Sequence, residues 1–199
     1  MNNSVKQYVV IKAKGGLGNR ILCAITGLLY AEATNRTPIV DWTDGMYDAP
    51  KVNAFPHLFS YSKAGDQTSL LPKLRDNIYP DIWNGRLDKS ISEMMSDLPP
   101  RSHRSRFIHR KFSINVQHNH TSHDIVVFWN YIDRLNNLRP LLKRTGHPFA
   151  NLNRCDIIGE FLKTRLPIQP KIQSAINGFY TENFKHPTIG VHMRYTDRK

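Results

Sequence analysis

A glycine-rich loop near the start of the chain is the first candidate for chemistry. Its glycines are Gly15, Gly16 and Gly18, and Asn19 follows the last of them. Glycine lets a ligand approach the backbone closely, and N–H groups at a helix N-terminus favour negative charge. The loop therefore suits a phosphate or pyrophosphate. Its spacing matches neither G-x-G-x-x-G nor a Walker loop, so a plain strand-to-helix turn is an equal alternative.

A second group of polar residues follows the last β-branched run, at 188–192. Gly190, His192 and Arg194 alternate along the chain, so a strand would project them to one side. Arginine suits forked contact with phosphate oxygens, and a neutral histidine can orient a ligand or donate a hydrogen bond. The carboxyl ends of parallel strands are where α/β sheets bind ligands. The sequence predicts an anion site here, with solvated terminal residues as the alternative.

Residues 101–123 form a third candidate, a basic and histidine-rich stretch. Phe107 and Phe112 are interleaved with basic residues, as a nucleic-acid surface would require, and the H-x-H-x-x-H spacing at 118–123 would suit a metal ion. No cysteine or carboxylate cluster lies nearby to complete a metal shell. The favoured interpretation is a solvated, mobile loop. The basic and histidine residues are Arg101, His103, Arg104, Arg106, His109, Arg110, Lys111, His118, His120 and His123.

The charge of the chain is unevenly distributed. The 199 residues include 28 Lys+Arg and 16 Asp+Glu, and residues 101–199 hold 17 of the basic and 6 of the acidic residues. This excess suggests an anionic partner. Hydrophobic residues make up 40% of the chain, which excludes a disordered protein. The longest apolar stretch, 21–33, is too short to span a bilayer, and residues 1–7 lack a signal-peptide pattern, so we expect a cytoplasmic protein.

Two cysteines and one aspartate have a structural interpretation. Cys23 and Cys155 are far apart and flanked by apolar residues, which favours buried free thiols over a disulfide or metal pair. Asp41 ends a predicted strand, where it could contact a ligand. A cap of the following turn is the favoured role.

The elements that position these residues follow from the apolar pattern. The run at 8–11 is typical of a buried strand, and residues 21–29 show the spacing of one helix face, with Asn35 as its expected end. A second strand is predicted at 38–42. A strand, helix and strand of this length form a βαβ unit, so the sheet should be parallel.

The rest of the chain continues the α/β pattern after an irregular, proline-rich stretch. The apolar run at 125–129 predicts a central strand. A weak helix is expected at 90–98, and a last buried strand at 188–192. Three further helices are predicted at 132–144, 154–166 and 170–183.

Four motifs, taken in order, resemble those of a known family. They are Gly-Gly-Leu-Gly-Asn-Arg at 15–20, Asn-Arg-Thr-Pro-Ile-Val-Asp-Trp at 35–42, Val-Asn-Ala-Phe-Pro at 52–56 and Ile-Gly-Val-His-Met-Arg at 189–194. The chain resembles the nodulation-type (NodZ-like) fucosyltransferases and, more distantly, the eukaryotic core fucosyltransferases. The resemblance runs from about residue 8 to 197 and is weakest between 60 and 120.

The resemblance implies a fold and an activity. The family has two facing Rossmann-like domains, the GT-B arrangement, and transfers fucose from GDP-fucose with inversion, without a metal or another cofactor. Its acceptor is an N-acetylglucosamine unit of a chitin oligosaccharide or an N-glycan core. By this resemblance, residues 1–185 are the N-terminal, acceptor-side domain. Residues 186–199 are the first strand and motif of the donor-binding domain.

The resemblance also assigns roles to single residues. Arg194 would hold the donor diphosphate and stabilise the leaving GDP, as a metal does elsewhere. His192 would contact the nucleotide or position the loop, and Asp197 would orient the basic residues. The donor side of the first domain would be lined by Gly16, Gly18 and Asn19.

Two expectations about activity follow. In the family the nucleotide-binding domain continues beyond the H-x-R motif, so we expect the 199-residue chain by itself not to turn over GDP-fucose. The alternative function is a basic module that binds RNA or another polyanion. No recognised nucleic-acid motif is present, so no nucleic-acid partner is expected, and the oligomeric state is not indicated.

Overall fold

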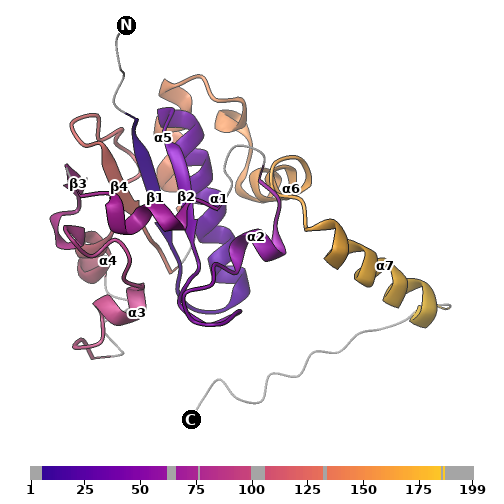
Figure 1. The fold of residues 1–199 in the computed structure, drawn as a ribbon. Helices are drawn as coiled ribbons and strands as arrows, with labels where there is room; N and C mark the ends of the chain where they lie inside the picture. The colour runs from indigo at the N-terminus through magenta and orange to yellow at the C-terminus, as the bar shows by residue number, and fades with distance from the viewer. Residues whose placement is uncertain are drawn as a thin grey trace, which may run out of the picture.

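Four parallel strands form one sheet in the order β2-β1-β4-β3 (Figure 1). The computed structural model describes residues 6–61, 66–75, 77–99, 106–131, 134–184 and 186. The strands are β1 (Tyr8–Lys12), β2 (Thr37–Asp41), β3 (Ile78–Tyr79) and β4 (Ile125–Phe128). The predicted parallel α/β sheet is confirmed, and β4 is a central strand with β1 and β3 on its two sides.

The register of the strands brings three strand ends to one edge of the sheet. Tyr8 pairs with Thr37 in β2 and with Ile125 in β4, so the three strands start together. Because all of them run in the same direction, the segments after Lys12, Asp41 and Phe128 leave the sheet at its carboxyl edge. This edge is where parallel α/β sheets form ligand sites.

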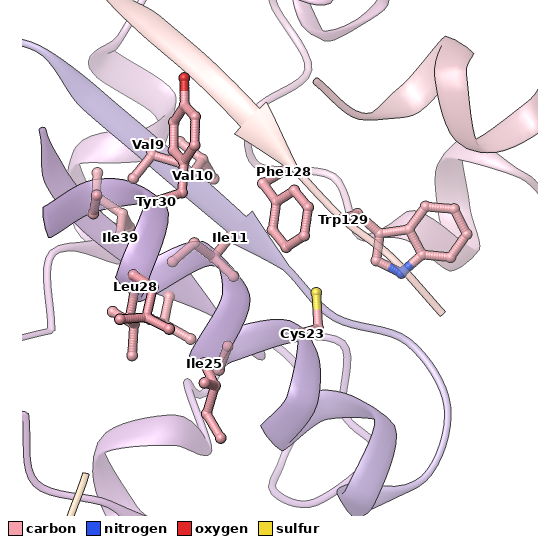
Figure 2. Close-up of a cluster of buried hydrophobic side chains, with 14 of the residues drawn as sticks. Val9, Val10, Ile11, Cys23, Ile25, Leu28, Tyr30, Ile39, Phe128 and Trp129 are labelled. Carbon is pink, nitrogen blue, oxygen red and sulfur yellow. The ribbon is translucent and has the colours of Figure 1, made fainter. Parts of the chain in front are cut away.

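Helix α1 (Leu17–Thr34) follows the glycine loop and covers one face of the sheet (Figure 1). Its contact with β1 is close, because a Cβ atom at Gly27 would lie 2.7 Å from Cγ1 of Ile11. Figure 2 shows Ile11, Phe128 and Cys23 in the apolar core that α1 forms with the strands. Asn35 ends the helix in the left-handed conformation with φ 55°, which confirms the predicted terminator.

The remaining helices are shorter than α1. They are α2 (Phe55–Leu58), α3 (Ile91–Met94), α4 (Arg106–Phe112), α5 (Leu135–Arg144), α6 (Arg154–Thr164) and α7 (Pro170–Asn183), with 3-10 turns at Thr68–Lys73, Asp81–Trp83 and Pro148–Asn151. The weak helix expected at 90–98 is a single turn, α3, which Ser90 and Glu93 cap reciprocally. The predicted helices at 154–166 and 170–183 are confirmed as α6 and α7.

The structure corrects two of the expectations. The basic stretch was expected to be a mobile loop, but its residues 106–112 form helix α4, because Ile108 and Phe112 pack on the core. Cys155 is exposed instead of buried, because it lies in the first turn of α6 on the side away from the buried Ile157 and Phe161. Cys23 is buried, and both cysteines are free, as predicted.

Helix α7 extends away from the sheet (Figure 1). None of its residues is buried, and its apolar side chains Ile176, Phe179 and Tyr180 are 47%, 59% and 63% exposed. The apolar face that the sequence pattern predicts is therefore present, but it covers nothing in the described part of the chain. The strand expected at 188–192 lies outside the described residues.

The amino edge of the sheet is closed by one arginine. The guanidinium of Arg36 donates hydrogen bonds to the carbonyl oxygens of Asp124, His120 and His123 at 3.1, 2.8 and 2.9 Å. These bonds fix the histidine-containing loop before β4 against the start of β1. Among the described residues, no helix has the length and hydropathy needed to cross a membrane.

Candidate functional site

The glycine loop follows the carboxyl end of β1. Its three glycines differ in whether the backbone conformation and the neighbouring atoms require glycine. Gly15 has φ +87°, and a Cβ atom there would lie 3.2 Å from Cε2 of Tyr131. Gly16 is the N-cap of α1 and Gly18 lies in its first turn, and no described atom lies within 4 Å of a Cβ built on either. The turn requires only Gly15. Gly16 and Gly18 leave backbone open to solvent at the helix N-terminus, where an anion is favoured.

Arg20 fixes this loop to the segment after β2. Its Nε donates to the Gly15 carbonyl oxygen at 2.8 Å, and its Nη1 and Nη2 donate to the two carboxylate oxygens of Asp44 at 3.0 and 2.6 Å. The guanidinium also lies over the rings of Trp42 and Tyr47, at 5.8 and 5.2 Å. Arg20 is 1% exposed, so this arginine of the Gly-Gly-Leu-Gly-Asn-Arg motif shapes the loop and does not reach a ligand.

A buried ion pair lies under the same edge. The Nζ atom of Lys12 donates to Oδ2 of Asp41, to the carbonyl oxygen of Leu87 and, at 2.9 Å, to that of Lys89. The other oxygen of Asp41 accepts from the Thr43 backbone N–H at 3.1 Å, which confirms the predicted cap. The sequence pattern did not indicate the Lys12–Asp41 pair. Both side chains are fully occupied by these contacts, so neither faces a ligand.

Cys23 joins the ends of β1 and β4. Its Sγ lies 3.4 Å from the Lys12 carbonyl oxygen, to which the thiol donates, and accepts from the Asn130 backbone N–H at 3.3 Å. Burial raises the pKa of the Cys23 thiol to about 12, so the sulfur stays protonated at neutral pH. A protonated, buried thiol is a packing group and not a nucleophile.

A polar pocket of about 460 Å³ opens beside the carboxyl end of β4. It lies between residues 113–117 and the start of α5, and Phe128 and Asn130 of the strand end line its inner side. The sequence pattern did not predict this pocket. A signal was present, because Asn130 and Arg134 follow directly after the predicted central strand, at the edge where ligands bind.

The histidines at 118–123 do not form a metal site. The ring of Tyr79 stacks on His120 and packs at a tilt against His123, with ring centroids 5.2 and 4.8 Å apart. The Nε2 atom of His120 lies 2.9 Å from the Asn115 carbonyl oxygen, and burial lowers the pKa of His120. Within the described ranges, no three histidine, cysteine or carboxylate residues are arranged to hold a metal ion.

The predicted ligand residues divide into two groups. Gly16, Gly18 and Asn19 lie together at the N-terminus of α1, on the carboxyl edge. His192, Arg194 and Asp197 lie outside the described residues. The expected meeting of the glycine loop with the H-x-R motif therefore stays a prediction.

The sheet order, the strand directions and the loop together define a Rossmann-like α/β fold. No protein-family model matches the chain, and no curated protein matches its sequence. Solved structures with a similar fold include the fucosyltransferase NodZ from Bradyrhizobium, with a TM-score of 0.56, 16% identity and 92% of this chain covered. A selenomethionine structure of the same enzyme gives 0.58, with 16% identity and 92% of this chain covered.

Two further similar structures come from NodZ that was given a nucleotide ligand. One is NodZ alpha-1,6-fucosyltransferase soaked with GDP-fucose, with a TM-score of 0.53, 16% identity and 90% of this chain covered. The other is the enzyme co-crystallised with GDP, with a TM-score of 0.53, 17% identity and 92% of this chain covered. This chain spans 56–58% of the length of these NodZ chains. The chain has the fold of the part of NodZ that it covers.

Proposed function

We propose that residues 1–185 are the acceptor-side domain of a GT-B fucosyltransferase, and that residues 186–199 begin its donor-binding domain. The enzyme would transfer fucose from GDP-fucose to an N-acetylglucosamine-containing saccharide, with inversion and without a metal. The observation that carries the proposal is the likeness to NodZ over 92% of the chain. The order of the four sequence motifs supports the same assignment.

The proposed reaction uses residues from both parts of the chain. An acceptor hydroxyl oxygen, whose proton passes to a base, attacks the anomeric carbon of fucose on the face opposite the diphosphate, and the bond to GDP breaks with its electrons on the leaving phosphate. Arg194 stabilises that charge, and His192 contacts the nucleotide. Gly16, Gly18 and Asn19 approach the donor from the N-terminus of α1, where the open backbone described above favours a diphosphate.

Helix α7 supports a two-domain arrangement. Exposed apolar patches are typical of surfaces that pack against another domain or partner. The patch formed by Ile176, Phe179, Tyr180 and Phe184 lies just before the segment proposed to enter the donor-binding domain.

The proposal is tested by a transfer assay and a binding assay on the same 199-residue chain. With radiolabelled GDP-fucose and chitin oligomers we expect no turnover, because the family's guanine pocket lies beyond the H-x-R motif. Saturation-transfer NMR should nevertheless show chitin tetramer bound to the chain. Clear turnover would contradict the expected inactivity, and the absence of saccharide binding would contradict the acceptor-side assignment.

A basic polyanion-binding module is the second candidate. Helix α4 carries Arg110 and Lys111 next to Phe107, which is 78% exposed, as a stacking surface for single-stranded RNA would need. Thermal shift separates the candidates. We expect GDP, held by its diphosphate at the N-terminus of α1, to raise the melting temperature more than a single-stranded RNA of equal concentration does. The reverse order would favour the polyanion module.

A further inference from the structure

The pocket beside β4 is walled by donors of hydrogen bonds. Six of its side chains are amides or guanidiniums, and they come from α4, the segment 113–117, the end of β4 and the start of α5. They are Arg110, Asn115, Gln117, Asn130, Arg134 and Asn137. Such groups match the hydroxyl and oxyanion groups of a polar ligand and would not suit an apolar one.

The charge of the pocket is one-sided. Arg110 and Arg134 are its ionised side chains, and none of the described residues that line it is Asp or Glu. The N-terminal end of α5 lies at Leu135, beside the pocket, and its helix dipole adds partial positive charge. A ligand that carries a negative group is therefore favoured over a neutral one.

Three of these side chains are available to a ligand. In the ranges that the structure describes, the side chains of Arg110, Gln117 and Asn137 make no hydrogen bond or ion pair with the protein. The segment 113–117, which carries Gln117, is nevertheless fixed at both of its ends. Nη2 of Arg144 donates to the Gln117 carbonyl oxygen, and the Trp129 backbone N–H donates to Ser113 Oγ at 3.0 Å. The pocket thus holds free donors on a positioned backbone.

One of the pocket's lining residues, His109, is fixed by an aromatic contact in the core. His109 is 7% exposed and stacks on Trp129, with ring centroids 4.4 Å apart and planes 4° from parallel. The stacked pair anchors α4 to the end of β4, and Arg110 is the next residue on that helix. The position of Arg110 at the pocket is therefore set by the core.

We propose that this pocket binds an oxyanionic substituent, such as a sulfate, phosphate or carboxylate, on the acceptor saccharide. The saccharide nature of the ligand rests on the proposed function, whereas the negative charge is inferred from the pocket alone. The volume of about 460 Å³ accommodates a sugar unit with its substituent.

The experiment is calorimetric titration of the 199-residue chain at low salt with four probes. They are neutral chitin tetramer, the same tetramer carrying a sulfate ester, a tetramer of glucuronic acid, and inorganic sulfate. We expect each charged saccharide to bind roughly tenfold more tightly than neutral chitin, as one charge-assisted hydrogen bond provides. Comparing the sulfate ester with the uronic acid identifies which oxyanion is preferred.

Two variants locate the binding. Arg110→Gln removes a positive charge from the pocket but keeps a hydrogen-bond donor, and Arg86→Gln is the matched control, since Arg86 is exposed and does not line the pocket. We expect R110Q to lower the affinity for the charged saccharides about tenfold and R86Q to leave that affinity unchanged. Both arginines are exposed, so melting temperatures should stay at the wild-type value.

Several results would overturn the proposal. Equal losses in R110Q and R86Q would show non-specific attraction to a basic protein. Equal affinity for neutral and charged saccharides would show that the pocket does not recognise an oxyanionic substituent. Tighter binding of single-stranded RNA, titrated as a fifth probe, with the same dependence on Arg110 would assign the pocket to nucleic acid. If inorganic sulfate bound and none of the saccharides did, the anion site would stand. The saccharide ligand and the proposed function would both be contradicted.

Discussion

The Nε atom of Arg20 lies 2.8 Å from the carbonyl oxygen of Gly15, in the turn that brings the chain from β1 into α1. The same guanidinium holds Asp44 after β2 with two further hydrogen bonds. One buried side chain thereby fixes two of the three segments at the carboxyl edge. The open backbone at Gly16 and Gly18 owes its position to this contact.

Replacing Arg20 with lysine should destabilise the protein by about 1–3 kcal/mol, since lysine keeps the charge but loses the planar fork. Urea denaturation measures the change. Arg86→Lys is the control and should change the free energy of unfolding by less than about 0.5 kcal/mol. Equal stability of R20K and the unmodified protein would show that the fork to Asp44 and Gly15 contributes nothing.

Breaking the buried ion pair of Lys12 and Asp41 should lower the free energy of unfolding by more than the change at Arg20. Lys12→Met leaves the Asp41 carboxylate buried without its partner, and a loss of about 3–5 kcal/mol is expected. The double variant Lys12→Met, Asp41→Asn should recover much of this loss, because asparagine is neutral and can still accept from Thr43. Chemical denaturation of the three proteins tests the pair. A double variant less stable than Lys12→Met would contradict this account.

The glycines should respond to alanine in opposite ways. Gly15→Ala places a Cβ at φ +87° and 3.2 Å from Tyr131, so a loss of about 1–2 kcal/mol is expected. Gly18→Ala lies in a helix with open space around it and should raise stability by about 0.5–1 kcal/mol. Thermal denaturation gives the sign of both changes. A destabilised Gly18→Ala would mean that its backbone is strained.

The thiol of Cys23 should make stability fall at alkaline pH. Its pKa is raised from 9.0 to about 12 in the folded protein, so the unfolded chain loses its proton first. The stabilisation is complete below pH 9 and is lost between pH 9 and about 12; Tyr30, whose pKa is raised from 10.0 to about 12, adds to the loss.

Denaturation curves from pH 8 to 11 measure this loss, and Cys23→Ala should flatten the dependence while Cys155→Ala leaves it unchanged. Native thiol labelling should modify Cys155 alone, because Cys23 is buried. Labelling of both cysteines in the folded protein would argue against the buried site.

Elements with a clear apolar pattern, either a continuous run or a helical period, were predictable from the sequence. The runs at 8–11 and 125–129 give β1 and β4 because they are buried on both faces, and Asn35 ends α1 because it tolerates a positive φ. Strand β3 has only two residues and no period, so the irregular stretch between 43 and 100 hid it. Helix α4 was not predicted because its segment is mostly basic. Of its apolar residues, Ile108 and Phe112 pack on the core.

The candidate site was predictable only where it is local in sequence. The glycine loop could be recognised because its residues are consecutive. The pairs Lys12–Asp41 and Arg20–Asp44 join residues separated by 29 and 24 positions, and only the strand register brings them together. The pocket depends on α4 and α5 approaching β4 from two sides, a relationship that no spacing of residues expresses.

Helix α7 has a consequence for the dynamics of the chain. A fourteen-residue helix is marginal by itself, and α7 gains no stability from burial in the described structure. Its backbone amides should exchange with solvent deuterium through local opening, whereas those of β1 and β4 should exchange only when the whole sheet unfolds. In hydrogen-exchange terms, α7 is a separate unit of unfolding, and any partner that covers its apolar face will be detected first as slower exchange between residues 170 and 183.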